Sequence, residues 1–142
     1  MKLTKLDHKI ANKKLNRVKV MLEKVNNNIL RFVKTYGFER IPRSQQSSSK
    51  LVFTHKKLGV VVKVPYLSGD TADIPLHSIP TIVVRRPRVQ SWDYAHILIQ
   101  PLGRLTNTDE AHAILERRAE VIADSHEGNV AWYKNCPVWI DW

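Results

Sequence analysis

The first 36 residues constrain the fold most, because they include a long segment without proline or glycine in which apolar side chains recur at helical spacing. The segment covers residues 4–36 and is followed by Gly37. Its apolar stripe consists of Leu6, Ile10, Leu15, Val18, Met21, Val25, Ile29, Phe32 and Val33. The pattern predicts a helix that Thr4 or Asp7 can cap, that the asparagines at 26–28 can divide, and whose stripe packs on the rest of the domain.

After Gly37 the sequence changes to short runs rich in β-branched residues. Such runs, separated by turn residues, are typical of strands. The first three are expected to form an antiparallel meander, and two more follow beyond an irregular stretch at 67–80. The predicted strands are Phe38–Ile41, Leu51–Phe53, Val60–Val64, Thr81–Val84 and His96–Gln100.

The last third of the chain predicts a helix followed by a hairpin. The helix is expected from about Thr108 to Ile122, and the hairpin strands are Val130–Tyr133 and Val138–Ile140, around a turn at Lys134–Pro137. The whole pattern indicates an α+β fold. We expect one domain over 1–142, with a helical segment at 1–37, a sheet lobe at 38–102, and a helix with a loop and hairpin at 103–142.

Charge and composition point to an anionic partner. The chain has 23 Lys and Arg against 13 Asp and Glu, which gives a formal net charge of +10. Residues 1–63 contain lysine runs such as Lys13–Lys14 and Lys56–Lys57, and Arg85, Arg86 and Arg88 form a second basic cluster. Such a surface attracts nucleic acid, nucleotides or acidic proteins at long range. One cysteine excludes an internal disulfide framework, and no apolar stretch is long enough for a membrane span. We therefore expect a cytoplasmic protein with a macromolecular partner.

Three oxygen-bearing side chains near the carboxyl end suggest a specific chemistry. Asp124 and Asn129 lie five positions apart in a loop after the predicted helix, and Asp141 ends the hairpin that follows. Phosphoryl transfer needs a carboxylate near the attacking hydroxyl, together with an amide oxygen and a second carboxylate that hold Mg²⁺. A hairpin between Asn129 and Asp141 would bring the two ends of this segment together.

The segment Asp124-Ser125-His126-Glu127-Gly128-Asn129 resembles the D-x-H-x-G-N catalytic loop of the aminoglycoside-phosphotransferase branch of the protein-kinase-like superfamily. Ile140-Asp141-Trp142 resembles that branch's form of the kinase D-F-G motif. The resemblance implies a truncated kinase-like fold that uses ATP and Mg²⁺. It implies Asp124 as the catalytic base, Asn129 and Asp141 as metal ligands, and His126 as a residue that stabilises the loop.

Upstream residues match the same family more loosely. Lys63 stands in the predicted third strand, where the superfamily has its phosphate-binding lysine. The segment Ser47-Ser48-Ser49-Lys50 occupies the place of the glycine-rich loop, and its backbone amides and hydroxyls can contact phosphate. The stretch from Ile97 to Leu102, which includes Gln100, resembles the hinge that binds adenine by backbone hydrogen bonds. An edge-strand lysine would explain Lys63 equally well.

Departures from the family pattern favour binding over catalysis. The sequence ends one residue after Asp141, no glutamate follows Lys63 before the hinge, and Ile122 and Ala123 replace the usual His-Gly pair. Glu23 of the N-terminal helix is one candidate partner for Lys63. We therefore expect a degenerate kinase-like protein that binds a nucleotide, a phosphate or a macromolecule. An active Mg²⁺-ATP phosphotransferase and a basic adaptor of the viral accessory type, binding host protein or nucleic acid, are the alternatives.

Overall fold

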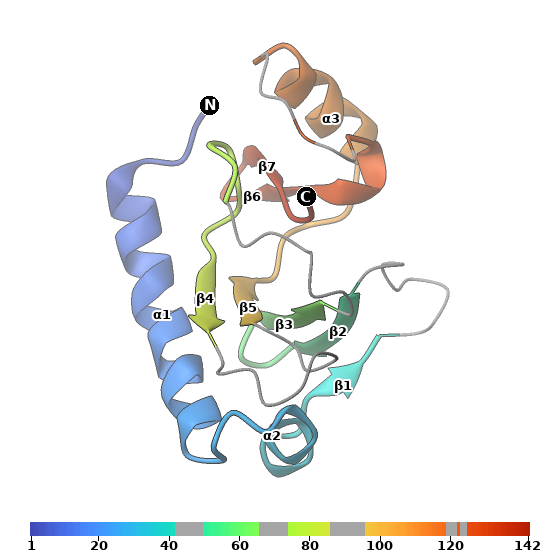
Figure 1. Ribbon diagram of the computed structural model, residues 1–142. Coiled ribbons are helices and arrows are strands. Elements are labelled where there is room, and N and C mark those ends of the chain that lie inside the picture. The colour runs from blue at the N-terminus through green and yellow to red at the C-terminus, as the bar shows by residue number, and fades with distance from the viewer. Residues whose placement is uncertain (42–49, 66–73, 86–95, 119–121, 123–124) are drawn as a thin grey trace. The chain divides into compact units, whose positions relative to one another are not determined.

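The computed structural model describes residues 1–41, 50–65, 74–85, 96–118, 122 and 125–142. Within these residues the predicted α+β fold is confirmed, with three α-helices, a five-stranded antiparallel sheet and a C-terminal two-stranded hairpin (Figure 1). The elements are α1 (Lys5–Glu23), α2 (Ile29–Tyr36), β1 (Glu39–Arg40), β2 (Lys50–His55), β3 (Val60–Pro65), β4 (Ile82–Arg85), β5 (His96–Pro101), α3 (Thr108–Glu116), η2 (Glu127–Asn129), β6 (Val130–Tyr133) and β7 (Cys136–Trp139).

The chain forms two compact units. Unit 1 comprises Met1–Ala11, Asp73–Pro80 and Gly103–Trp142, and unit 2 comprises Asn12–Ala72 and Thr81–Leu102. Unit 2 therefore contains the five-stranded sheet, whereas unit 1 contains α3 and the β6–β7 hairpin.

The N-terminal helical segment is two helices rather than one, because the asparagines interrupt it. Asn26 and Asn27 have positive φ angles of 57° and 56°, a conformation that asparagine tolerates better than most residues. Asn28 then caps α2, its side chain accepting a hydrogen bond from the Arg31 N–H. Both candidate caps of α1 take part in one capping box: Thr4 Oγ1 accepts from the Asp7 N–H, and the Asp7 carboxylate accepts from the Thr4 N–H.

The sheet of unit 2 has the strand order β1-β2-β3-β5-β4 with every neighbouring pair antiparallel, so the predicted meander of the first three strands is confirmed. Alternate residues of these strands face α1 and α2, and together they form the main core of the unit. The fully buried members include Leu15, Leu22, Phe32, Val60, Val62, Val64, Ile97 and Ile99. The helices thus cover one face of the sheet.

In unit 1, the hairpin turn is shorter than the sequence suggests. Lys134 and Asn135 both have positive φ angles, 49° and 61°, as in a two-residue type I′ turn, so β7 begins at Cys136 and the predicted four-residue turn is wrong. Pro137 is tolerated in β7 because hydrogen-bonded and non-hydrogen-bonded pairs alternate along an antiparallel ladder. Trp139, two positions further on, donates its N–H to the His77 carbonyl rather than to β6. Pro137 lies two positions before Trp139, so its backbone nitrogen also points away from β6. The missing N–H therefore removes no hydrogen bond between the two strands.

Helix α3 also ends earlier than predicted, at Glu116 rather than near Ile122. The Arg118 N–H donates to the Leu115 carbonyl, which closes a tighter turn than an α-helical one. Ala111 and Leu115 of α3 pack with Val130 and Trp139 of the hairpin, and this cluster is the core of unit 1. No helix in the described part of the chain is long and apolar enough to cross a membrane.

The core of unit 2 makes a direct prediction. Phe32 is fully buried and contacts the ring of Phe38 at a centroid distance of 4.6 Å, whereas Leu30 on the same helix is 74% exposed. Phe32→Ala is expected to lower the free energy of unfolding by about 3–5 kcal/mol, because it removes buried surface and leaves a cavity. Leu30→Ala should change it by about 0.5 kcal/mol or less. Urea denaturation measures both, and equal effects would contradict this packing.

Candidate functional site

The hairpin of unit 1 brings two of the predicted metal ligands next to each other. The Asn129 carbonyl accepts hydrogen bonds from the Ile140 N–H at 2.8 Å and from the Asp141 N–H at 3.4 Å. Asn129 is buried and Asp141 is half-buried. One carboxylate oxygen of Asp141 accepts from the Trp142 N–H at 3.1 Å. The two residues, twelve positions apart in the sequence, are therefore neighbours at the open end of the hairpin.

His126 holds the loop that leads to Asn129. Its Nδ1 accepts a hydrogen bond from the Gly128 N–H at 3.0 Å, and its carbonyl accepts from the Asn129 N–H at 3.0 Å. These contacts cap the short helix η2. Gly128 fits this arrangement because a Cβ there would lie 2.8 Å from His126 Cε1, which is closer than side chains tolerate. The loop conformation therefore depends on both the histidine ring and the glycine.

A further cluster, which the sequence did not predict, attaches the same loop to α3. His112 Nε2 lies 3.0 Å from Ser125 Oγ and 3.1 Å from Glu116 Oε1, and Ser125 Oγ also donates to Glu116. A Ser–His–acid triad needs the carboxylate on the other ring nitrogen, Nδ1. Here both contacts use Nε2, so the cluster is a structural link. The i, i+4 spacing of His112 and Glu116 on a helix was the sequence signal for it.

Four of the predicted site residues lie outside the described residues, namely Asp124, Ser47, Ser48 and Ser49. The basic residues Arg86 and Arg88 also lie outside them. The structure therefore brings together Asn129 and Asp141, while the roles of Asp124 and of the three serines stay predictions. Among the described residues there is no group of three or more His, Cys, Asp and Glu side chains that could hold a metal ion.

Lys63 and Gln100 lie in unit 2, on the sheet face opposite to the helices. The register pairs Lys63 with Val52 and with Leu98, and it pairs Gln100 with Val61. Directly paired residues share a face, and residues two apart on a strand share it too. The buried polar residues of the sheet all lie on this face, which we call the polar face: Lys50, Lys63, His96 and Gln100.

The structure corrects two expectations about Lys63. It is not an edge-strand lysine, because β3 lies between β2 and β5. Glu23 is not brought to it either, because α1 packs on the opposite face through Leu15 and Leu22, and Glu23 is exposed. The alternation along β3 places Lys63 on the face opposite to its apolar neighbours, and the apolar stripe of α1 packs on those neighbours. The sequence did not reveal the strand order or the register that put Lys63 in the middle of the sheet.

Sequence reasoning placed Lys50 in the segment at the glycine-rich-loop position but did not select it as a site residue or predict its burial beside Lys63. It is only 4% exposed, and the pairing of Lys50 with Pro65 places it two positions from Lys63 along the β2–β3 pair. Side chains in such diagonal positions are within reach of each other. The alternation of Lys50, Val52 and Thr54 was an available signal, since it assigns all three to one face. Gln100 on the same face donates from Nε2 to Thr81 Oγ1 at 3.2 Å.

The contact between His126 and Gly128 predicts energetic coupling. In the wild-type background, Gly128→Ala displaces the histidine ring and breaks the Gly128 N–H to Nδ1 bond, which contributes about 1 kcal/mol. In a His126→Ala background there is no ring to displace. The change that Gly128→Ala makes in the free energy of unfolding should therefore be more favourable there by about 1 kcal/mol. A double-mutant cycle in urea measures this difference. Strictly additive effects would show that the ring does not support the loop.

Comparisons of the chain with protein-family models, with curated proteins and with solved structures find no match.

Proposed function

We propose that the protein is a reduced kinase-like protein that binds a nucleotide together with Mg²⁺, and that it acts by binding rather than by efficient phosphoryl transfer. The observation that carries the proposal is the pairing of Asn129 and Asp141 through the backbone at the open end of the hairpin. Their identities are those of the two Mg²⁺ ligands that the resemblance to aminoglycoside phosphotransferases implies.

The chemistry of this pair suits Mg²⁺. The ion is a hard cation that prefers oxygen ligands, keeps several waters, and is held by one or two protein groups together with the substrate phosphates. An amide oxygen of Asn129 and a carboxylate oxygen of Asp141 supply two such ligands. A larger protein cage is not needed for this mode of binding. Bound Mg²⁺ would neutralise phosphate charge.

The polar face of unit 2, taken by itself, is a second candidate for binding a phosphate group. Lys50 and Lys63 place two ammonium groups of like charge on neighbouring strands, both less than one-tenth exposed. A lysine ammonium donates charge-assisted hydrogen bonds to an anion. A phosphate group has both the charge and the acceptor oxygens for this role. Gln100 on the same face is 1% exposed and donates to Thr81 Oγ1, so a role for this stretch in binding adenine rests on the resemblance alone.

Two observations favour binding over transfer. In the sequence no glutamate lies between Lys63 and Gln100, and α1 does not bring Glu23 to Lys63, so neither supplies the lysine–glutamate pair of an active kinase. The His-Gly pair expected before Asp124 is also replaced by Ile122 and Ala123. Both changes affect parts that organise catalysis more than they affect ligand contact.

The metal half of the proposal predicts a Mg²⁺-dependent stabilisation by ATP. A ligand at 100 times its dissociation constant stabilises a protein by about 2.7 kcal/mol, which a thermal-shift titration detects as a rise in Tm. Asp141→Asn removes the carboxylate charge and keeps an acceptor for the Trp142 N–H, so it should abolish the part of the rise that depends on Mg²⁺. Glu127→Gln removes a nearby exposed carboxylate and should retain that part. If Mg²⁺ does not change the Tm of the wild-type protein in the presence of ATP, the proposal is refuted.

The phosphate half is tested separately at the sheet. Lys63→Met keeps the length of the side chain but removes its charge, and it should weaken ATP binding at least about tenfold. Lys57→Met, on the exposed turn between β2 and β3, is the matched control and should leave the affinity within about twofold. Equal weakening by both variants in isothermal titration calorimetry would indicate general attraction by the +10 charge. In that case the basic-adaptor alternative would be favoured.

A further inference from the structure

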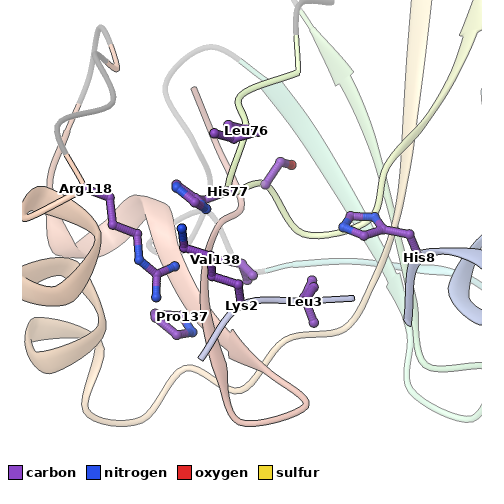
Figure 2. Close-up of a pocket in the computed structure, with 9 residues that line it drawn as sticks. Lys2, Leu3, His8, Leu76, His77, Arg118, Pro137 and Val138 are labelled. Atoms are coloured by element: carbon purple, nitrogen blue, oxygen red, sulfur yellow. The ribbon is translucent and has the colours of Figure 1, made fainter. Parts of the chain in front are cut away.

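Unit 1 contains a basic pocket that the proposed nucleotide function does not use. It is a cavity of about 190 Å³ lined by Lys2, Leu3, His8, Leu76, His77, Ser78, Arg118, Pro137 and Val138 (Figure 2). Four of these nine residues carry basic side chains and none is acidic. We define the basic pocket by those four: Lys2, His8, His77 and Arg118.

The basic side chains come from different elements, which lets them approach a ligand from several directions. His8 stands on α1, Arg118 follows α3, Lys2 belongs to the N-terminal segment, and His77 precedes β4. Figure 2 draws Lys2, His77 and Arg118 toward one side of the pocket and His8 toward the other. Three donors on one side of a pocket suit a phosphate group, which offers three or more strong acceptor oxygens.

Backbone contacts hold two of these residues in place. Residues 77–79 run beside β7 as a parallel bridge: the His77 carbonyl accepts from the Trp139 N–H at 3.0 Å, and the Ile79 N–H donates to the Trp139 carbonyl at 2.9 Å. Arg118 Nη2 donates to the Met1 carbonyl at 3.1 Å. A guanidinium has five N–H donors, so others are available for a ligand. The backbone at His77 is therefore held beside β7, and the Arg118 side chain is held against the N-terminal segment.

The acidic residue beside His8 in the sequence is engaged elsewhere. Asp7 accepts from the Thr4 N–H at 2.8 Å, and its carboxylate lies 3.7 Å from Lys134 Nζ. Hydrogen bonds from the Thr4 backbone and hydroxyl, with Lys134 nearby, hold the pKa of Asp7 below its ordinary value. The charged carboxylate of Asp7 therefore caps α1, and it does not line the cavity.

The size of the cavity limits the ligand. Pockets for drug-sized molecules span roughly 300–1,000 Å³, so a cavity of about 190 Å³ suits a small group. Leu3, Pro137 and Val138 contribute apolar wall to the cavity. We propose that the basic pocket binds a single phosphate group, either as inorganic phosphate or as the end of a small phosphomonoester.

The test is an NMR titration of the ¹⁵N-labelled full chain at fixed ionic strength, with EDTA present so that no Mg²⁺ takes part. Inorganic phosphate should give saturable amide shifts at His77, Ser78 and Arg118, and acetate at equal ionic strength should bind at least about tenfold more weakly. Methyl phosphate distinguishes the two sources of the group. Tighter binding than inorganic phosphate assigns a monoester, and weaker binding assigns the free anion.

Matched variants separate the pocket from the general positive charge. Arg118→Gln should raise the dissociation constant for phosphate at least about tenfold, whereas Arg117→Gln, its exposed neighbour outside the pocket, should leave it within about twofold. Lys2→Gln, at an exposed position where folding is unaffected, should weaken binding in the same direction, with Lys5→Gln as its control. Equal effects of Arg117→Gln and Arg118→Gln, or shifts that do not saturate, would overturn the proposal.

The two proposals fail independently. Asp141→Asn should retain phosphate binding in EDTA, because Asp141 does not line the basic pocket. Loss of phosphate binding in Asp141→Asn would overturn the assignment to this pocket. Conversely, if ATP binding does not depend on Mg²⁺, only the proposed nucleotide function is refuted. The phosphate titration, which is carried out in EDTA, still tests the basic pocket.

Discussion

The position of Asp141 beside Asn129 depends on two hydrogen bonds, which the Asn129 carbonyl accepts from the N–H groups of Ile140 and Asp141. It exists because Lys134 and Asn135 form a two-residue turn with positive φ angles, which fixes the register of β6 and β7. A one-residue slip would exchange the faces of every side chain in the hairpin. Trp139 would then leave the core that it forms with α3, so the packing of unit 1 and the position of Asp141 are secured together.

Local patterns in the sequence predicted most of the elements. The Pro- and Gly-free segment predicted the N-terminal helices, and β-branched runs predicted all five strands of the sheet with boundaries within a few residues. The errors came from backbone conformations that residue type alone does not fix. The predicted turn at Lys134–Pro137 has four residues, yet the observed turn has two, and Pro137 is accommodated where the ladder needs no N–H. Helix α3 ended early although its apolar pattern continued.

The candidate site was only partly accessible to sequence reasoning. The spacing of Asn129 and Asp141 around a predicted hairpin was sufficient to expect them side by side. The position of Lys50 near Lys63 was not, because cross-strand neighbours depend on the register of β2 and β3, which spacing does not encode. The basic pocket was equally inaccessible, since its four basic residues come from parts of the chain that are distant in sequence. Tertiary contacts alone bring such residues together.

The central claim, that Asn129 and Asp141 hold a divalent cation, is tested most directly by paramagnetic broadening. Mn²⁺ takes the same oxygen ligands as Mg²⁺ and broadens the NMR signals of nearby nuclei. With a non-hydrolysable ATP analogue present, substoichiometric Mn²⁺ should broaden the amide signals of Asn129, Ile140, Asp141 and Trp142 first, and excess Mg²⁺ should restore them. Broadening that spares these four residues, or that begins elsewhere in the chain, would contradict the account.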